Sequence, residues 1–475
     1  MYTLGIDSST QSVKALVYDV EAKSAVTTVS VNFGKELPEF GCPDGFLPNE
    51  DPLVRQADPL LWVAALDKVL RKLADSFDTS KIDAIGGDGQ QHGSVYLSAD
   101  WTSALESLKF KVQSGKCLTD IFSRVFSRPV APIWMDSSTH SEVAALDARF
   151  DEDLRRRTGS PAIERFTGPQ IMKFAKCDPS AFAATKRIHL VSSFLCSLLA
   201  GEDAPIDTGD GAGMNLLDLG KGAWDREICD FVAPGLLDKL PAVYTCGSRL
   251  RLAPYFAKYG FRPGIPVVPF TGDNPASLVG TGADMPGVAV ISLGTSDTFF
   301  AAMPDFRTDP DGCGHVFGNP SGGFMSLACF KNGSLAREKV RAMVGCDYRF
   351  FDETAFEEVS KSQLSTQSSR LLRAFPYFEE EITPKHAATG IEANFDWNAA
   401  SDAEKVVSVV RAQVLNMFER TRWIGSFDTI RVTGGASRSK GIRGTIAAVF
   451  GAKVETLDVP DSAALGGAIL AARGL

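Results

Sequence analysis

Two short segments, far apart in the chain, combine the same small residues in a similar order. Residues 4–12 form an apolar stretch that runs into Asp, Ser and Thr, and residues 290–297 form another that runs into Gly, Thr, Ser and Asp. Each is predicted to be a tight turn between two strands, and small hydroxyl residues in such a turn leave backbone N–H groups free to bind an anion. A hairpin that occurs twice in this way suggests two related domains that face one polyphosphate.

The first turn also carries charged side chains that suit a metal-bound phosphate. Asp7 at the end of the strand could hold Mg²⁺, Thr10 could approach phosphate, and Lys14 could neutralise charge. Taken alone, this turn is explained better by residues that satisfy their own backbone. The similar turn at Gly294 and Thr295 is what favours a function. The chain has no Walker-type phosphate-loop sequence, so a site of that class is excluded.

Residues 271–278 place an acid at the carboxyl end of a predicted strand. Asn274 and Pro275 fit the N-cap and the first position of a helix, so Asp273 would lie in the crevice where open α/β sheets bind ligands. A carboxylate there can accept the proton of a hydroxyl group that attacks a phosphoryl group. An acid that merely stabilises the start of a helix explains this position equally well.

Other polar and glycine-rich segments are weaker signals when each is taken alone. Residues 89–93 place Gln91 and His92 between glycines, which suits a ligand with many hydroxyl groups, although a histidine satisfied within a loop is the simpler explanation. Gly434 and Gly435 follow a predicted strand and would let the backbone approach a charged group, or they serve a tight turn. Taken alone, Arg165 is interpreted as an ordinary exposed arginine.

The elements that must position these residues are strands alternating with helices, which predicts an α/β fold. Strands are expected at residues 82–87, 265–270 and 429–433, and helices at residues 59–73 and 402–425. At 475 residues the chain is longer than one hydrophobic core usually serves. We place the division after residue 255, which gives an N-terminal domain of residues 1–255 and a C-terminal domain of residues 256–475.

Composition and charge exclude several classes of protein. The chain is 44% hydrophobic and 23% charged, and its net charge of -9 lacks the basic footprint of a nucleic-acid-binding protein. Nine cysteines without C-x-x-C spacing favour reduced thiols over disulfides or a zinc site. With no secretory signal and no apolar stretch long enough to span a membrane, we expect a cytoplasmic protein that binds neither membrane nor nucleic acid. Nothing indicates whether it is a monomer or a homodimer.

Taken together, the motifs resemble those of the FGGY carbohydrate kinases, and within them the xylulokinase group, particularly its eukaryotic-type sequences. The resemblance runs from Gly5 to Gly467 and depends on the joint order of its pieces. The most specific pieces are residues 89–93, 134–139, 164–168, 271–278, 292–298 and 329–334.

The resemblance implies two ribonuclease-H-like (actin-like ATPase) domains that flank a central catalytic cleft. The N-terminal domain would bind the sugar and the C-terminal domain ATP. Asp273 would be the general base that acts on the C5 hydroxyl of D-xylulose. The residues at the family's sugar-binding positions are His92, Arg165, Asp273 and Asn274, and Gln91 beside His92 joins them. The nucleotide positions are Gly294, Thr295, Gly434 and Gly435. Asp7 and Thr10 match the first phosphate motif, and Asp7 would hold Mg²⁺.

Four positions depart from the residues usual in the family: Asp88, Thr208, Tyr348 and Ser439. These bear on the identity of the sugar and on the adenine contacts more than on phosphoryl transfer. A kinase for another ketose or polyol, such as ribulose, stays open. An actin-like ATPase module without sugar turnover would explain the two hairpins, but it leaves Gln91, His92 and Arg165 without a purpose.

Overall fold

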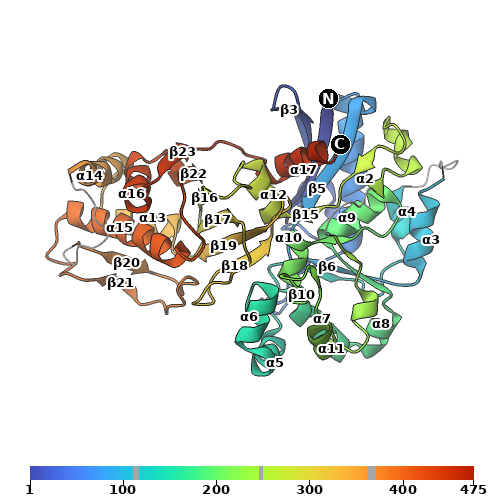
Figure 1. Cartoon of the computed structure of the whole chain (residues 1–475), viewed down its shortest axis with the longest axis horizontal. Helices are drawn as coiled ribbons and strands as arrows, with labels where there is room; N and C mark the ends of the chain where they lie inside the picture. The colour runs from blue at the N-terminus through green and yellow to red at the C-terminus, as the bar shows by residue number, and fades with distance from the viewer. Residues whose placement is uncertain (111–116, 245–249, 362–370) are drawn as a thin grey trace. The chain divides into compact units, whose positions relative to one another are not determined.

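The computed structural model describes residues 1–110, 117–244, 250–361 and 371–475 (Figure 1). These residues form two compact units. Unit 1 comprises Met1–Gly280, Phe317–Gly322 and Asp461–Leu475, and unit 2 comprises Thr281–Val316 and Gly323–Pro460. The division predicted after residue 255 falls within unit 1, inside the 3-10 helix Pro254–Tyr259.

Unit 1 is built on a seven-stranded sheet with the order β13-β14-β5-β1-β2-β3, in which β15 also pairs with β5. The N-terminal hairpin of β1 and β2 is antiparallel, and β5 joins β1 in parallel. The bounds are β1 Tyr2–Ser8, β2 Ser12–Asp19, β3 Ser24–Asn32, β5 Ile82–Gly89, β13 Leu250–Arg251, β14 Pro266–Val267 and β15 Thr271–Gly272. The strand predicted over residues 265–270 is therefore shorter than expected.

One face of this sheet packs against helices. Leu4 and Ile6 on β1 point into a core that also contains Trp62 and Leu66 of α2 (Pro59–Ser76). The sequence explains why α2 begins where it does, because Asp58 caps it by accepting a hydrogen bond from the Leu60 backbone at 2.8 Å. The helix α9 (Val191–Ala200) is buried along its whole length, its three serines included, and its apolar residues pack in the same core.

The other face of the sheet is covered by α17 (Ser462–Arg473), the C-terminal helix drawn in red beside β5 and α12 (Asp273–Gly280) (Figure 1). Glycines make this approach close enough to exclude any side chain. A Cβ atom at Gly5 would lie 1.8 Å from the Ala464 carbonyl oxygen, and one at Gly466 would lie 1.9 Å from the Ala276 oxygen. Residues 461–475, which were predicted to belong to the C-terminal domain, thus complete unit 1.

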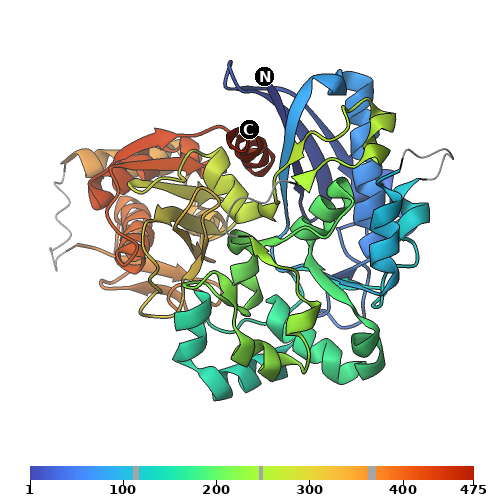
Figure 2. The same cartoon turned by 45° about the vertical axis from the view of Figure 1, so that its right-hand side comes forward.

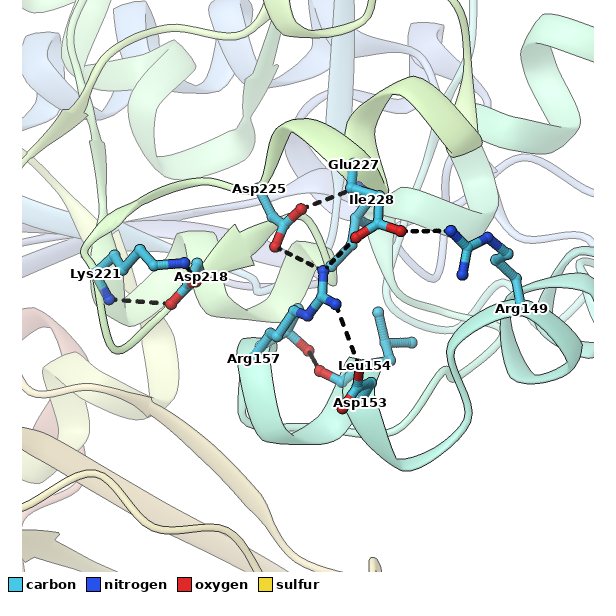
Figure 3. Close-up of polar contacts among 10 residues, drawn as sticks. Arg149, Asp153, Leu154, Arg157, Asp218, Lys221, Asp225, Glu227 and Ile228 are labelled. Atoms are coloured by element: carbon cyan, nitrogen blue, oxygen red, sulfur yellow. Dashed lines mark hydrogen bonds and ion pairs between the residues drawn. The ribbon is translucent and has the colours of Figure 1, made fainter.

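The remainder of unit 1 is mainly helical, with α5 His140–Phe150, α6 Glu152–Thr158, α7 Thr167–Cys177, α8 Pro179–Ala184 and α11 Arg226–Val232. Figure 3 shows Arg157 of α6 reaching towards the start of α11. Its guanidinium lies 2.8 Å from Glu227 and 3.3 Å from Asp225, and Arg149 of α5 also pairs with Glu227. The network joins three helices at the surface, where each ion pair contributes about 1 kcal/mol or less.

Unit 2 repeats the arrangement that opens unit 1. Its six-stranded sheet has the order β18-β19-β17-β16-β22-β23. The hairpin of β16 and β17 is antiparallel, and β22 joins β16 in parallel, as β5 joins β1. The bounds are β16 Val288–Leu293, β17 Asp297–Met303, β18 His315–Gly318, β19 Phe324–Phe330, β22 Thr429–Thr433 and β23 Lys453–Thr456.

The helices of unit 2 are α13 Ser334–Val344, α14 Tyr348–Lys361, α15 Asp402–Thr421 and α16 Lys440–Phe450 (Figure 2). A small antiparallel pair, β20 Ala374–Tyr377 and β21 Gly390–Ala393, accompanies them. The predicted hairpins, the strand at 429–433 and the helix from residue 402 are all present. Within the described residues, no helix combines the length and apolar character needed to cross a membrane. The eight cysteines described are free, and Cys246 lies outside the described residues.

Candidate active site

Two aspartates lie side by side at the ends of β1 and β5 in unit 1. Asp7 and Asp88 are direct partners in the parallel register of these strands, and Asp7 is also opposite Lys14 on β2. Both carboxylates are buried, with 5% and 0% of the residue exposed. Lys14 Nζ donates to Asp461 Oδ1 at 2.9 Å, so the lysine joins β2 to the start of α17.

Burial dominates the electrostatics of this pair. Desolvation raises the pKa of Asp7, although Lys14 opposes the shift. The pKa of Asp88 is raised well above its usual range, first by desolvation and then by the neighbouring charge of Asp7. The two carboxyl groups interact with each other, and among the described residues no other donor reaches Oδ1 of Asp7 or either oxygen of Asp88. Oxygens of this kind fit a cation such as Mg²⁺.

Asp273 is the first residue of α12, two residues earlier than the start predicted at Pro275. Asp273 directly follows the strand β15, and Thr271 of β15 is the register partner of Asp88 on β5. Desolvation and the charge of Asp7 raise the pKa of Asp273 to about 7, against the hydrogen bond from the Asn274 backbone at 2.9 Å. A half-buried carboxylate with this pKa can exchange a proton near neutral pH.

The side chains of the predicted sugar site are held by one another. Asn274 Nδ2 donates to Gln91 Oε1 at 2.9 Å and to Asp273 Oδ1 at 3.1 Å. Gln91 Nε2 donates to the carbonyl of Gly209 at 3.3 Å. Gln91, which was predicted to bind substrate, therefore has both ends of its amide engaged and orients Asn274.

His92 has a left-handed backbone, with φ of 69°, which is unusual for a residue other than glycine. Its ring stacks on Phe166 with centroids 4.2 Å apart, and Nδ1 lies 2.9 Å from the carbonyl oxygen of Gly213. A Cβ atom at Gly213 would lie 2.6 Å from this nitrogen. The ring is thus fixed by contacts on one side and one edge. Arg165, the neighbour of Phe166, places its guanidinium 5.7 Å from the same ring.

The turn between β1 and β2 is fixed by an exposed tryptophan. Trp134 is 42% exposed, and its indole N–H donates to Thr10 Oγ1 at 2.8 Å. Two residues further on, Asp136 is fully buried and accepts hydrogen bonds from the Arg55 backbone at 3.0 Å and from Gln170 at 2.9 Å. Within residues 134–139, Asp136 therefore holds the backbone, while Trp134 contacts a predicted phosphate-binding residue.

Two further buried acids lie behind Asp273. Thr271 donates to Asp207, whose pKa desolvation raises to about 6, and Ser192 donates to Asp210. Desolvation also raises the pKa of Asp210 well above its usual range, and the charge of Asp273 adds to this. Neither acid was identified from the sequence, because a Gly-Asp-Gly loop reads as an ordinary tight turn.

Unit 2 contains a cavity of about 740 Å³, a size typical of a site for a small molecule or cofactor. Three predicted nucleotide-binding residues line it: Gly294, Thr295 and Gly435. Gly434 has a φ of 87° that favours glycine, and a Cβ atom there would lie 2.5 Å from the Leu293 carbonyl oxygen. A Cβ atom at Gly435 would meet nothing within 4 Å, so backbone there is open to a ligand.

Arginine and aromatic side chains form the other walls of this cavity. Arg341 stacks over the ring of Tyr348 at 4.2 Å, and the Tyr348 hydroxyl donates to Glu338 at 2.9 Å. Ser439 donates to Asp352, which also accepts from the Gly441 backbone at 2.8 Å. Tyr348 and Ser439, two of the positions that differ from the usual family residues, thus line the cavity together.

An ion pair and a buried glutamate fix the start of α13 at the cavity. Arg337 donates to both oxygens of Asp297, at 2.7 and 2.8 Å, and both residues are buried. Glu381 accepts from the backbone of Lys331 at 2.6 Å and of Asn332 at 3.1 Å. The segment 329–334 is therefore organised from two sides. Neither Arg337 nor Glu381 was identified from the sequence, because their partners lie 40 to 50 residues away.

The predicted site residues thus gather in two places. Unit 1 holds the predicted sugar, base, metal and first phosphate residues, and unit 2 holds the glycines and Thr295 of the second phosphate motif. Across the ranges described, no group of three or more His, Cys, Asp or Glu side chains is arranged to hold a metal ion by itself. The individual roles, and the cleft expected between two domains, stay predictions.

Comparison with protein families decides the class of protein. The N-terminal domain of the FGGY family of carbohydrate kinases matches residues 127–280, and the C-terminal domain of the same family matches residues 289–475. The chain belongs to the FGGY family of carbohydrate kinases. The family resemblance inferred from the motifs is confirmed, and so is the conclusion that the chain is a sugar kinase enzyme.

Curated relatives in this FGGY family align along almost the whole chain. A xylulose kinase of Rattus norvegicus is 39% identical over 99% of this chain and 88% of its own length. Xylulose kinase 2 of Arabidopsis thaliana is 37% identical over 99% of this chain and 87% of its own length.

Solved structures of sugar kinases share the fold. A xylulose kinase from Rhodospirillum rubrum superposes with a TM-score of 0.80 at 19% identity, covering 100% of this chain and 90% of that one. A glycerol kinase from Plasmodium falciparum superposes with a TM-score of 0.76 at 17% identity, covering 99% and 89%. The predicted α/β fold of the actin-like, ribonuclease-H-like class is confirmed, while these identities are too low to indicate a substrate.

Proposed function

We propose that this FGGY kinase transfers the terminal phosphoryl group of ATP to the C5 hydroxyl of D-xylulose. The names and near-complete alignment of the rat, mouse and Arabidopsis relatives support xylulose as the sugar. The observation that carries the chemistry is Asp273, a half-buried carboxylate whose pKa is raised to about 7 and which lies beside Asn274. ATP as co-substrate follows from the kinase family.

The residues of unit 1 have different roles in binding and activating the sugar. Asp273 accepts the proton of the attacking hydroxyl, which makes the oxygen a stronger nucleophile as the new P–O bond forms. Arg165 donates hydrogen bonds to the sugar hydroxyls, while Asn274 Oδ1 and His92 Nε2 accept them, because the amide N–H groups of Asn274 and the Nδ1 edge of His92 are already engaged. Gln91 holds the Asn274 amide in place, so that Asn274 keeps a fixed orientation when the sugar binds.

The nucleotide is assigned to the cavity of unit 2, with its phosphates at the Gly294 and Thr295 turn and its base near Gly435 and Tyr348. Thr10 and Lys14 would serve the transferred phosphoryl group, and Asp7 would hold Mg²⁺, whose charge neutralises the phosphates. Backbone N–H groups in tight turns of this kind are suited to anions whatever the net charge of the chain.

The free cysteines support a reducing compartment, so we place the enzyme in the cytoplasm. Its partners are the sugar and ATP. The net charge of -9 supports the absence of nucleic acid from this group, and both monomer and homodimer remain compatible with the sequence.

ADP release with a panel of ketoses and polyols, together with a control without sugar, tests the function. We expect D-xylulose to give the highest kcat/KM and the sugar-free control to give little ADP. D-ribulose, glycerol or a hexitol as the best acceptor would reassign the substrate within the family. ADP release that is equal with and without every sugar would instead favour an ATPase module and contradict the proposal.

A further inference from the structure

Asp88 has no part in the mechanism above, although it lies at the acidic end of the unit 1 sheet. Its side chain is fully buried, with 0% of the residue exposed. Apart from the Asp7 carboxyl group, no donor among the described residues reaches either of its oxygens. An ionised carboxylate without donors or a counter-charge is strongly unfavourable here, so Asp88 keeps its proton in the free chain and can ionise where a bound cation replaces that proton.

The backbone directs Asp88 towards Asp7. The two residues are register partners on parallel strands, where paired side chains lie on the same face, with Cα atoms about 4.8 Å apart. This face is the one covered by α17, because Gly5 and Gly86, two residues earlier on the same strands, contact that helix. Oδ1 of Asp7 also lacks a donor outside this pair. Three carboxylate oxygens that no donor outside the pair reaches therefore belong to neighbouring side chains on one face of the sheet.

The single positive charge of Lys14 does not balance the carboxyl groups around it if all of them are ionised. Its ammonium group faces Asp7 across the β1–β2 pair, but it is bonded to Asp461 Oδ1 at 2.9 Å. The charge of Asp273 also acts on Asp88. One lysine could not balance four ionised carboxylates at low dielectric constant, so the site can hold protons in the free chain and exchange them for a cation.

Carboxylate oxygens are the ligands that Mg²⁺ and Mn²⁺ prefer, and proteins often hold these ions by one or two carboxylates with water and phosphate completing the shell. We propose that Asp7 and Asp88 together form a divalent-cation site that fills before the nucleotide binds. The inference rests on the proposed function only for the use of the ion in phosphoryl transfer. Because Asp7 and Asp88 are only two ligands, water takes the remaining positions until phosphate replaces it.

Titration of the full chain with Mn²⁺ in the absence of nucleotide and sugar, followed by the EPR signal of free Mn²⁺, measures the site directly. We expect the wild-type chain to bind Mn²⁺ at one site. Asp88→Asn keeps the shape of the side chain and removes its charge, so it should weaken binding by about tenfold or more. If the Asp88→Asn variant does not fold, Asp88→Ser takes its place, and we expect the same loss of Mn²⁺ affinity.

Asp136→Asn is the matched control. Asp136 is also fully buried in unit 1, but it accepts hydrogen bonds from the Arg55 backbone and from Gln170 and is not a strand partner of Asp7. This variant should bind Mn²⁺ within about twofold of the wild-type affinity. As a second readout, Mn²⁺ should raise the Tm of the wild-type chain and leave that of Asp88→Asn nearly unchanged.

Two results would overturn the inference: a wild-type chain that binds no Mn²⁺ without nucleotide, or an Asp88→Asn chain that binds it as tightly as wild type. The result is separable from the proposed function. A chain that binds Mn²⁺ through Asp88 but phosphorylates no sugar keeps the site and loses the function. A ketose kinase without Mn²⁺ binding in the absence of nucleotide keeps the function and loses the site.

Discussion

The side-chain amide of Asn274 donates to Gln91 Oε1 at 2.9 Å, which joins two motifs 183 residues apart in the chain. The same Asn274 amide reaches Asp273 Oδ1 at 3.1 Å, so Gln91, Asn274 and Asp273 form one chain of contacts. The loop after β5 and the start of α12 therefore depend on each other for their side-chain orientation.

We expect Gln91→Met, which keeps the length of the side chain, to raise the KM for D-xylulose about fivefold. Asn274 would lose its acceptor, and one hydrogen bond is worth about 1 kcal/mol. The KM for ATP should change little. Gln56→Met, on β4 (Gln56–Ala57) of the same unit, is the control and should leave the sugar KM unchanged. An unaltered sugar KM in Gln91→Met would show that Asn274 needs no such support.

Asp273→Asn should lower kcat by about 10²–10⁴, because an amide cannot accept the proton of the attacking hydroxyl. The Asn side chain still offers an oxygen to Asn274, so the sugar should bind with nearly wild-type affinity in an equilibrium titration. Asp230→Asn, an exposed residue of α11, makes the same change in charge and should leave turnover intact. Turnover near the wild-type value in Asp273→Asn would remove this residue from its role as base.

The pH dependence of kcat/KM should follow the ionisation of Asp273. A general base must be deprotonated, and the pKa of Asp273 is raised to about 7 by desolvation and by Asp7. The rate should therefore increase with pH up to about 7 and level off above it. Steady-state rates from pH 5 to 9 at low D-xylulose concentration and saturating ATP measure this profile. A rate that is constant from pH 5 upward would mean that Asp273 ionises at its ordinary pKa or is not the base.

The same pKa shift has an opposite effect on stability. Because the folded pKa of Asp273 is higher than its unfolded value of 3.8, the folded chain holds this proton more tightly. The contribution of Asp273 to the free energy of unfolding thus falls as pH rises from about 4 to about 7. Asp273→Asn should consequently stabilise the chain more at pH 8 than at pH 5, which differential scanning calorimetry can measure. An equal Tm difference at both pH values would contradict the shift.

Arg337→Met should reduce the free energy of unfolding by about 3–5 kcal/mol, because it leaves the buried Asp297 carboxylate without its two-point partner. Adding Asp297→Asn to this variant should recover part of the loss, since the uncompensated charge is then removed. Chemical denaturation of the two variants measures both values. If the double variant is no more stable than Arg337→Met, an unpaired Asp297 is not the cause.

The strands and helices with strong local patterns could be predicted from the sequence. Both hairpins are short apolar runs around small turn residues, and α2 has an Asp-Pro start and a regular apolar spacing. The start of α12 was placed two residues late because Asn274 and Pro275 match the preferences for a helix start, whereas the strand β15 ends directly at Asp273.

What the sequence could not reveal depends on long-range contacts. The role of α17 in unit 1 rests on backbone approach at Gly5 and Gly466, and a run of small residues does not say which sheet it covers. The pairing of Asp88 with Asp7 requires the register of two strands that are 81 positions apart, since a shift by one residue would turn Asp88 to the opposite face. For the candidate site residues, the family resemblance predicted which positions bind ligands, but not which residues their side chains contact.

The order in which a ribosome makes these residues differs from the order in which unit 1 can close. Unit 2 is synthesised in full by Pro460, whereas the first strands of unit 1 wait for Asp461–Leu475. Until then the glycine-lined surface of β1 and β5 has no covering helix, and Lys14 has no Asp461. A nascent chain thus carries an unfinished first half until residues 461–475 are made, and these residues complete both the packing of that half and the charge balance beside Asp7.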